Sequence, residues 1–343
     1  MTQRDLPPLA PDPVPDATPD LARRPRRRWR DLALGATLLA LFLAGLAGLA
    51  AATGWEEVAA HLGALTAGQM ALLLAFSLVN YLGRGARWHL FTRALGLPTG
   101  LGQDLRHFLG GFAMTVTPGR VGELIRMRWL RRETGWAYER TAPLVLADRA
   151  SDLAAMGLIL ALALALSAAG IAGALPIVAL ALGAAYVATH PRLLAALVTY
   201  AYRLVGGRAP RLFGRIRQAA RSLARFASPQ VFVPAIGLGL VGWFAEGYAL
   251  YLLLGWMGAD VGLWTAVAIF TFATLAGGLT GAPGGLGGAE AAMIALLKLQ
   301  GVPLEVSVPA TAVIRLTTLW FAILIGLAVF PMAERRAAKA VAA

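Results

Sequence analysis

Long apolar runs, each close to the length that crosses a lipid bilayer, constrain this chain more than any other feature. The clearest runs cover residues 32–53, 141–166, 171–189, 231–257 and 308–330. A helix of about 20 apolar residues spans the roughly 30 Å hydrocarbon core of a membrane. Only 14% of the residues are charged, against about 25% in soluble domains. The runs predict an all-α, polytopic transmembrane helical bundle.

Arginines at the ends of these runs predict the orientation of the chain. RRPRRRWR at 23–30 precedes the first run, Arg84, Arg87 and Arg93 follow a second run at 70–82, and residues 190–229 hold eight arginines and no acidic residue. Positive residues beside membrane spans favour the cytoplasmic side. We therefore expect a multi-pass plasma-membrane protein with both termini in the cytoplasm. The net charge of +13 is attributed to this bias and not to nucleic-acid binding.

Composition divides the chain into three parts. Residues 1–30 are rich in Pro, Asp and Arg and are expected to form a disordered basic cytoplasmic tail. Residues 31–332 form the transmembrane domain, and residues 333–343 form a second cytoplasmic tail. Within the loop 190–229, residues 211–226 have an amphipathic pattern that predicts a helix lying at the membrane interface, although a solvated loop remains an alternative.

Two apolar segments are interrupted and are interpreted as re-entrant elements. Residues 107–117 are too short to cross, and the segment that follows, 118–132, is dense in arginine. A crossing there would place those arginines outside, so 107–125 is expected to dip in from the cytoplasm and return. Residues 263–299 are broken at GAPGGLGGAE, 281–290, and are expected either to re-enter from the outer side or to cross twice. The prediction is about six full spans plus these two re-entrant elements.

The two interrupted segments resemble each other. Pro118-Gly119 in the first corresponds to Pro283-Gly284 in the second. Farther along, Gly135 and Arg149 have the same separation as Gly301 and Arg315. The predicted topology relates the two units as an inverted repeat, an arrangement that recurs in transporters with a substrate site near the membrane midplane.

Charged residues inside the predicted spans are the candidate site. Arg149 and Arg315 lie roughly 12 Å into their spans, where an unpaired arginine costs at least ~2.5–3.5 kcal/mol. Asp152 is one turn from Arg149, and Glu290 and Glu246 are candidate partners for Arg315. Each arginine therefore either holds the bundle together through an ion pair or contacts a lipid phosphate.

The helix breaks contribute three further candidates. Gly119 and Gly284 open the helices and expose backbone amides that suit anions. Glu123 follows the first break and serves either as a cap or interfacial salt bridge, or as a gate or head-group contact. The site residues predicted to bind substrate are Arg149, Arg315, Glu123, Glu290, Asp152, Gly119 and Gly284.

Other chemistry finds no support in the sequence. The chain has no cysteine, and its four histidines are scattered without metal-ligand spacing. No glycine-rich nucleotide loop precedes a helix, which argues against an ATP-driven pump. We expect no cofactor, no metal and no enzymatic activity.

Several motifs resemble a known family. PGRVGELIRMRWLRRETGW is followed by LADRASDL, and PGGLGGAEAAMIALLKLQGVP is followed by AVIRLTTLW. Together with RGARWHLF at 84–91, these resemble the lysylphosphatidylglycerol synthase transmembrane-region family, also called flippase-like, over about residues 30–332. The resemblance implies a membrane domain that moves or holds a lipid with a phosphate-bearing head group. In full-length synthases a cytosolic aminoacyl-transfer domain follows this region. The lysyl-transfer chemistry belongs to that domain, so a resemblance to the membrane region does not imply it here.

Three functions are compatible with these observations. The first is translocation of an anionic phospholipid or a polyprenyl-phosphate-linked lipid between leaflets. The second is an accessory role, in which the protein binds a lipid-linked intermediate or a membrane glycosyltransferase through the loop 190–229 without transport. The third is a membrane enzyme that uses Asp152 or Glu290.

Overall fold

The computed structural model describes residues 63–115, 122–166, 174–190 and 228–341, together with a few single positions outside these ranges. The described ranges contain helices and no strand, which confirms the predicted all-α class. The predicted first span 32–53, the break at Pro118-Gly119 and nearly all of the amphipathic segment 211–226 lie outside the described residues.

The first half of the described chain contains two long helices and several short ones. Its elements are α3 (Ala67–Leu95), α4 (Leu101–Gly110), the 3-10 turn η2 (Gly111–Met114), α5 (Gly122–Thr134), α6 (Tyr138–Leu166) and α7 (Ala174–Thr189). The second half contains α10 (Pro229–Trp256), α11 (Leu263–Leu279), η5 (Pro283–Gly285), α12 (Gly288–Leu299), α13 (Leu304–Arg315), the π-helical turn η6 (Leu316–Trp320) and α14 (Phe321–Ala340).

Three of the described helical stretches are long and apolar enough to cross a membrane: Arg140–Leu166, Pro229–Trp256 and Leu304–Ala340. The last of these combines α13, η6 and α14 into one continuous helix. α7 and α11 are also apolar but shorter. The chain is therefore a helical membrane protein, and the total of six spans stays a prediction.

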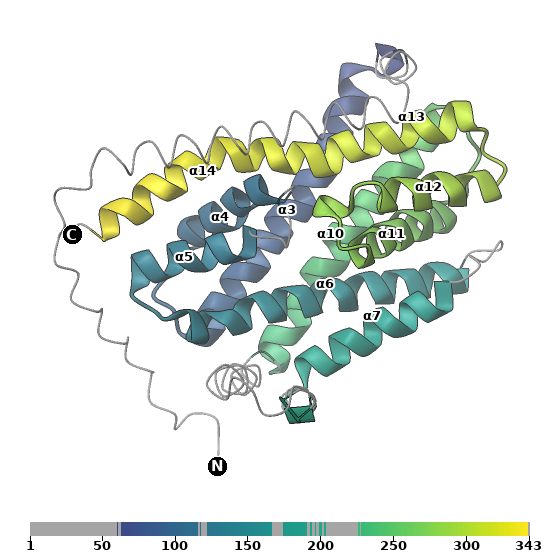
Figure 1. Cartoon of the computed structure of the whole chain (residues 1–343). Coiled ribbons are helices and arrows are strands. Elements are labelled where there is room, and N and C mark those ends of the chain that lie inside the picture. The colour runs from purple at the N-terminus through teal and green to yellow at the C-terminus, as the bar shows by residue number, and fades with distance from the viewer. Residues whose placement is uncertain are drawn as a thin grey trace.

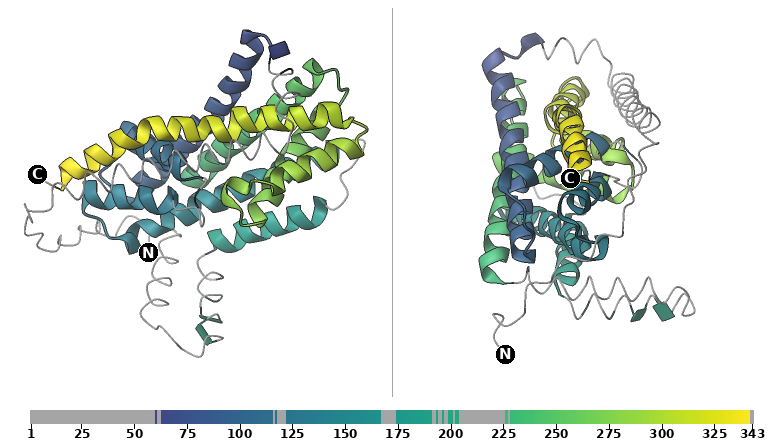
Figure 2. Two further views of the ribbon diagram at one scale, coloured as in Figure 1. Left: turned by 45° about the horizontal axis from the view of Figure 1, so that its top comes forward. Right: turned by 90° about the vertical axis from the view of Figure 1, so that its left-hand side faces the viewer.

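The helices form an elongated bundle (Figure 1). The continuous helix α13–α14 runs along its length, with α4 and α5 near the α14 end and α11 and α12 near the α13 end. α3 and α10 pack side by side along one flank, which is clearest in the right-hand view of Figure 2. α6 packs against α7 and also against α10 and α11, so it joins the first half of the described chain to the second.

Small residues allow close backbone approach at two of these contacts. A Cβ atom on Gly326 of α14 would lie 2.2 Å from the backbone nitrogen of Ala113 in η2. A Cβ atom on Gly277 of α11 would lie 2.6 Å from Cβ of Ala289 in α12. Helices inside a membrane associate largely through such close packing, because lipid is as apolar as the side chains that it meets.

Helix α3 differs from its prediction. It begins at a capping box formed by Thr66 and Gln69 and ends at Gly96, whose φ of 86° stops the helix. The helix therefore continues well beyond the expected span 70–82 and includes Arg84 and Arg87. These two side chains are buried inside the bundle, whereas the prediction placed them on a cytoplasmic end. Of the three arginines, only Arg93 is exposed.

The two interrupted units have the same local structure. In the first unit, α4 and η2 are followed in the chain by the short helix α5 and the long helix α6. In the second, α11 is followed by the short helix α12 and then by α13, which continues into α14 as one long helix. Gly135 after α5 and Gly301 after α12 both adopt left-handed conformations, with φ of 76° and 83°. Arg149 and Arg315 are each the twelfth residue of the following helix. The spacing of the repeat is thus matched in space, while the inverted orientation of the units across the membrane stays a prediction.

Candidate functional site

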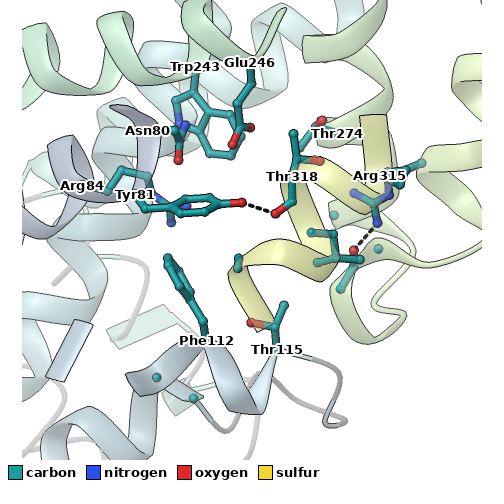
Figure 3. Close-up of a pocket in the computed structure, with 18 of the residues that line it drawn as sticks. Asn80, Tyr81, Arg84, Phe112, Thr115, Trp243, Glu246, Thr274, Arg315 and Thr318 are labelled. Carbon is teal, nitrogen blue, oxygen red and sulfur yellow. Dashed lines mark hydrogen bonds between the residues drawn. The ribbon is translucent and has the colours of Figure 1, made fainter. Parts of the chain in front are cut away.

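A cavity of about 190 Å³, partly open to the surface, lies where both units meet the flanking helices α3 and α10 (Figure 3). This central cavity is bordered by residues from most of the described elements, including Gly284 and Gly285 of the second break. Among the described residues, its charged lining consists of four arginines and one glutamate: Arg84, Arg126, Arg149, Arg315 and Glu246. The two arginines predicted from the repeat therefore line one common cavity.

Behind the cavity wall, acidic residues of α6 hold the arginines of α3. Arg84 Nη2 lies 2.8 Å from Asp152 Oδ2. Arg87, which is fully buried, bridges Asp148 at 2.5 Å and Asp152 at 2.7 Å. Short distances between these groups matter, because a buried ion pair offsets the free-energy cost of desolvation only when the opposite charges are close and hydrogen-bonded. These ion pairs fasten α3 to α6.

The predicted pair between Arg149 and Asp152 is present, but it is longer than the other pairs. Arg149 Nη1 lies 3.7 Å from Asp152 Oδ2, and the Arg149 side chain is 31% exposed. Asp152 also accepts a hydrogen bond from Trp243 Nε1 at 3.2 Å. Asp152 is therefore a buried positioning residue, and Arg149 is the most accessible of the cationic groups around the cavity for which exposure is given.

Arg126 reaches the cavity by passing over a glycine. A Cβ atom on Gly111 would lie 2.3 Å from Arg126 Nε, so no larger residue fits there without displacing the arginine. The guanidinium carbon lies 4.1 Å from the centroid of the Phe108 ring, within cation–π distance. Its Nη1 is 3.9 Å from Asp148 Oδ2. The guanidinium of Arg126 is therefore buried between α5 and the η2 turn.

Arg315 stabilises the second break. Its Nε donates to Glu290 Oε1 at 2.5 Å, and its Nη2 donates to the carbonyl oxygen of Gly284 at 2.9 Å. Gly284 has a φ of 62°, a left-handed conformation that glycine adopts without strain. Of the two partners predicted for Arg315, Glu290 is the one that contacts it. The side chain of Glu246 points toward the cavity (Figure 3) and forms no ion pair with the described part of the chain.

Uncharged polar groups complete the lining. The Tyr81 hydroxyl donates to the carbonyl oxygen of Thr318 in the π-helical turn. Asn80 is 1% exposed, and neither atom of its amide has a hydrogen-bond partner among the described residues. Buried polar groups nearly always have such a partner. Asn80 therefore marks a place where a polar ligand group or water would be accommodated.

The described charges around the cavity do not balance. Five arginines and four carboxylates gather there: Arg84, Arg87, Arg126, Arg149 and Arg315, with Asp148, Asp152, Glu246 and Glu290. Even with every carboxylate ionised, one positive charge is in excess. Three of the carboxylates lie behind the arginines and do not line the central cavity. The cavity therefore presents a positive surface suited to an anion.

The seven predicted site residues fall into three groups in the structure. Arg149, Arg315 and Gly284 line the cavity. Asp152 and Glu290 lie in ion pairs behind its wall. Glu123 belongs to α5, but its side chain, like the whole of Gly119, lies outside the described residues.

Arg84 and Arg126 also line the cavity and were absent from the predicted site. A signal for Arg84 was available in the spacing of the sequence. Arg84 and Arg87 are three residues apart on one helix, and Asp148 and Asp152 are four apart on another, so both pairs lie one turn apart. Within the described ranges, no three His, Asp or Glu side chains gather closely enough to hold a metal ion.

Apolar helices around an arginine-lined cavity define a helical membrane protein. The chain belongs to the family of the lysylphosphatidylglycerol synthase TM region, which matches residues 32–326. It is also similar to a UPF0104 membrane protein from Methanothermobacter thermautotrophicus. The two are 28% identical over 268 residues, which cover 71% of this chain and 79% of that protein.

Proposed function

We propose that the protein binds the anionic head group of a membrane lipid in the central cavity and carries that lipid between the two leaflets. The observation that supports this most directly is the convergence of four arginine side chains on one cavity. Guanidinium groups match the geometry of phosphate oxygens and stay charged when they are partly buried. The lipid is an anionic phospholipid or a polyprenyl-phosphate-linked lipid.

Each charged group has a distinct part in this proposal. Arg149 has the accessible side chain and makes the first contact with the phosphate. Arg315 lies on the wall formed by the second unit, held in place by Glu290 and Gly284. A phosphate between them would accept hydrogen bonds from both guanidinium groups. No covalent step is required of the protein, so its role is binding and movement and not catalysis.

The same proposal includes location and orientation. The protein resides in the plasma membrane as a multi-pass bundle with both termini in the cytoplasm. The arginine bias at the ends of the helices supports this orientation. Its partner is the lipid, with a membrane enzyme as a possible second partner.

Reconstitution into liposomes tests the proposal. Purified protein should accelerate the movement of a fluorescent phosphatidylglycerol or polyprenyl phosphate from the inner to the outer leaflet, measured by dithionite quenching. Arg149→Gln should abolish the acceleration, because it removes the accessible charge. Arg93→Gln is the matched control, since Arg93 is an exposed arginine that does not line the cavity.

Two results would decide against translocation. Equal leaflet exchange in protein-containing and empty liposomes for both lipids would overturn it. If Arg149-dependent lipid binding persisted in that case, and a membrane glycosyltransferase co-purified with the protein, the accessory role would replace it.

A further inference from the structure

A second cavity adjoins the central one. It has a volume of about 340 Å³ and lies between α6, α7 and α11. The two cavities share four lining residues: Arg149, Trp243, Thr274 and Gly278. They are therefore neighbouring compartments of one interior space, with Arg149 at the junction.

The two compartments differ in chemistry. Four arginines and a glutamate line the central cavity, whereas the second is lined chiefly by aliphatic side chains of α6, α7 and α11. In the described part of the chain, the charged residues that line it are Arg149 and Asp152, and Asp152 is paired with Arg84 and Arg87. A polar compartment beside an apolar one matches the two parts of a lipid.

The apolar compartment reaches the lipid-facing surface. Leu180 of α7 and Leu279 of α11 line it and are 54% and 62% exposed. Both belong to apolar helices, so we infer that the surrounding surface faces hydrocarbon. α7 packs mainly against α6 and only lightly against α11, which leaves the boundary between α7 and α11 as the weakest part of this wall.

Arg149 is suited to the junction. Its aliphatic stem can lie along apolar surface while its guanidinium faces a polar region. In this position the stem borders the apolar compartment and the charged head borders the arginine-lined one. A lipid with a phosphate close to the start of a hydrocarbon chain would place these two parts on the two sides of Arg149.

We propose that the cavity between α6, α7 and α11 is a slot for one hydrocarbon chain of the lipid whose head group occupies the central cavity. The lipid enters sideways from the bilayer between α7 and α11. This inference rests on the proposed function and adds that the protein recognises the chain as well as the phosphate. It follows that a head group without a long chain binds less tightly than the intact lipid.

Two variants on α7 test the slot. Ala184 lines the cavity and is exposed, so Ala184→Trp can fill the slot without disturbing the core. Ala179 is exposed on the same helix and lines neither cavity, which makes Ala179→Trp the matched control. Leu180→Trp is a second slot variant in case Ala184→Trp fails to fold, which thermal unfolding would reveal.

Binding is measured in detergent with dioleoyl- and dihexanoyl-phosphatidylglycerol, which share a head group and differ in chain length. Ala184→Trp should weaken binding of the dioleoyl lipid roughly tenfold, because excluding even two methylene groups has about that effect. Binding of the dihexanoyl lipid should be unchanged. Ala179→Trp should alter neither.

The outcomes separate the two proposals. If the folded slot variants bind the dioleoyl lipid as the unmodified protein does, while Arg149→Gln loses both lipids, the slot is wrong and the head-group site stands. If Arg149→Gln binds both lipids normally, the head-group site is wrong and the slot fails with it.

Discussion

Arg315 donates a hydrogen bond through Nη2 to the carbonyl oxygen of Gly284, 2.9 Å away, and so joins α13 to the break between α11 and α12. A helix break inside a membrane leaves backbone groups that water cannot satisfy. The guanidinium satisfies one of them, while its Nε is held by Glu290. One side chain thus both lines the central cavity and stabilises the break beside it.

Gly284→Ala should destabilise the protein. At a φ of 62° a Cβ atom costs about 1–2 kcal/mol, and here it would also lie 3.3 Å from the Leu319 side chain. The melting temperature in detergent should fall. Gly237→Ala is the control, because Gly237 lies within α10 with open space around it, and alanine there should be neutral or stabilising. A Gly284→Ala protein as stable as the control would contradict the structure of the break.

The ion pair between Arg315 and Glu290 predicts non-additive effects. Arg315→Met alone leaves Glu290 buried without its partner, which typically costs about 3–5 kcal/mol. The double variant Arg315→Met with Glu290→Met should recover much of that stability, because no buried charge remains. Lipid binding should stay weak in both, since the cavity has lost a cation. Thermal unfolding and lipid binding measured on the same samples check this, and equal melting temperatures for single and double variants would refute the pairing.

Glu246→Gln should strengthen binding of anionic lipid. Glu246 is the one carboxylate among the described side chains that line the central cavity, so it opposes an incoming phosphate when it is ionised. The amide keeps the size of the side chain and cannot ionise. Titration with dioleoyl-phosphatidylglycerol at alkaline pH, where the carboxyl group is ionised, should give a lower Kd than the unmodified protein. Weaker binding would indicate that Glu246 contacts a positive part of the ligand.

Stability should fall in acid because of Glu133 in α5. Burial by itself raises the pKa of Glu133, but His107 beside it and the charge of Arg106 outweigh burial, and the pKa lies below its usual value of 4.5. A carboxyl whose pKa is lowered by folding stabilises the folded state above its unfolded pKa. This contribution is lost as the pH falls from about 4.5 toward the lowered value. Melting temperatures recorded between pH 7 and pH 3 should decline in this window, and the decline should be smaller in Glu133→Gln.

Cysteine labelling tests the orientation, and the chain offers no background because it contains no cysteine. Cysteines introduced at the exposed positions 131 and 336 should react only from the cytoplasm, and one at 260 only from outside. Positions 61 and 215, which lie outside the described residues, are predicted to be external and cytoplasmic. Glu334 pairs with both Arg128 and Arg132, so 131 and 336 must lie on the same side. An external residue 131 would make the first re-entrant element a true span and end the inverted relation of the repeat.

The repeat was the most informative part of the sequence. Equal spacing from Gly135 to Arg149 and from Gly301 to Arg315 located two arginines that line one cavity, although nothing in the sequence brings them together directly. The two arginines take equivalent places because a left-handed glycine precedes each helix and fixes where it begins. A fixed number of residues then sets how far along the helix the arginine lies.

The burial of Arg84 and Arg87 was not predicted, for a physical reason. Arginines at the end of an apolar run normally indicate the cytoplasmic interface. Whether they are instead buried depends on acidic partners elsewhere in the fold, here Asp148 and Asp152 of α6, and those contacts are tertiary. Tertiary contacts also explain why residues 333–343, predicted to be a separate tail, are instead largely part of a packed helix. α14 continues to Ala340, and Ala333 and Ala337 are buried.

The continuous helix from Leu304 to Ala340 is longer than a membrane is thick. Its 37 residues extend roughly 55 Å, against a hydrocarbon core of about 30 Å. With Leu304 at one boundary, Arg315 lies about 16 Å deep, while Glu334 lies about 45 Å along the helix and outside the core. The two groups of ion pairs on this helix therefore occupy different dielectric media. Dissolved ions screen Glu334 from Arg128 and Arg132, whereas the attraction between Arg315 and Glu290 is insulated from the ionic strength of the solution.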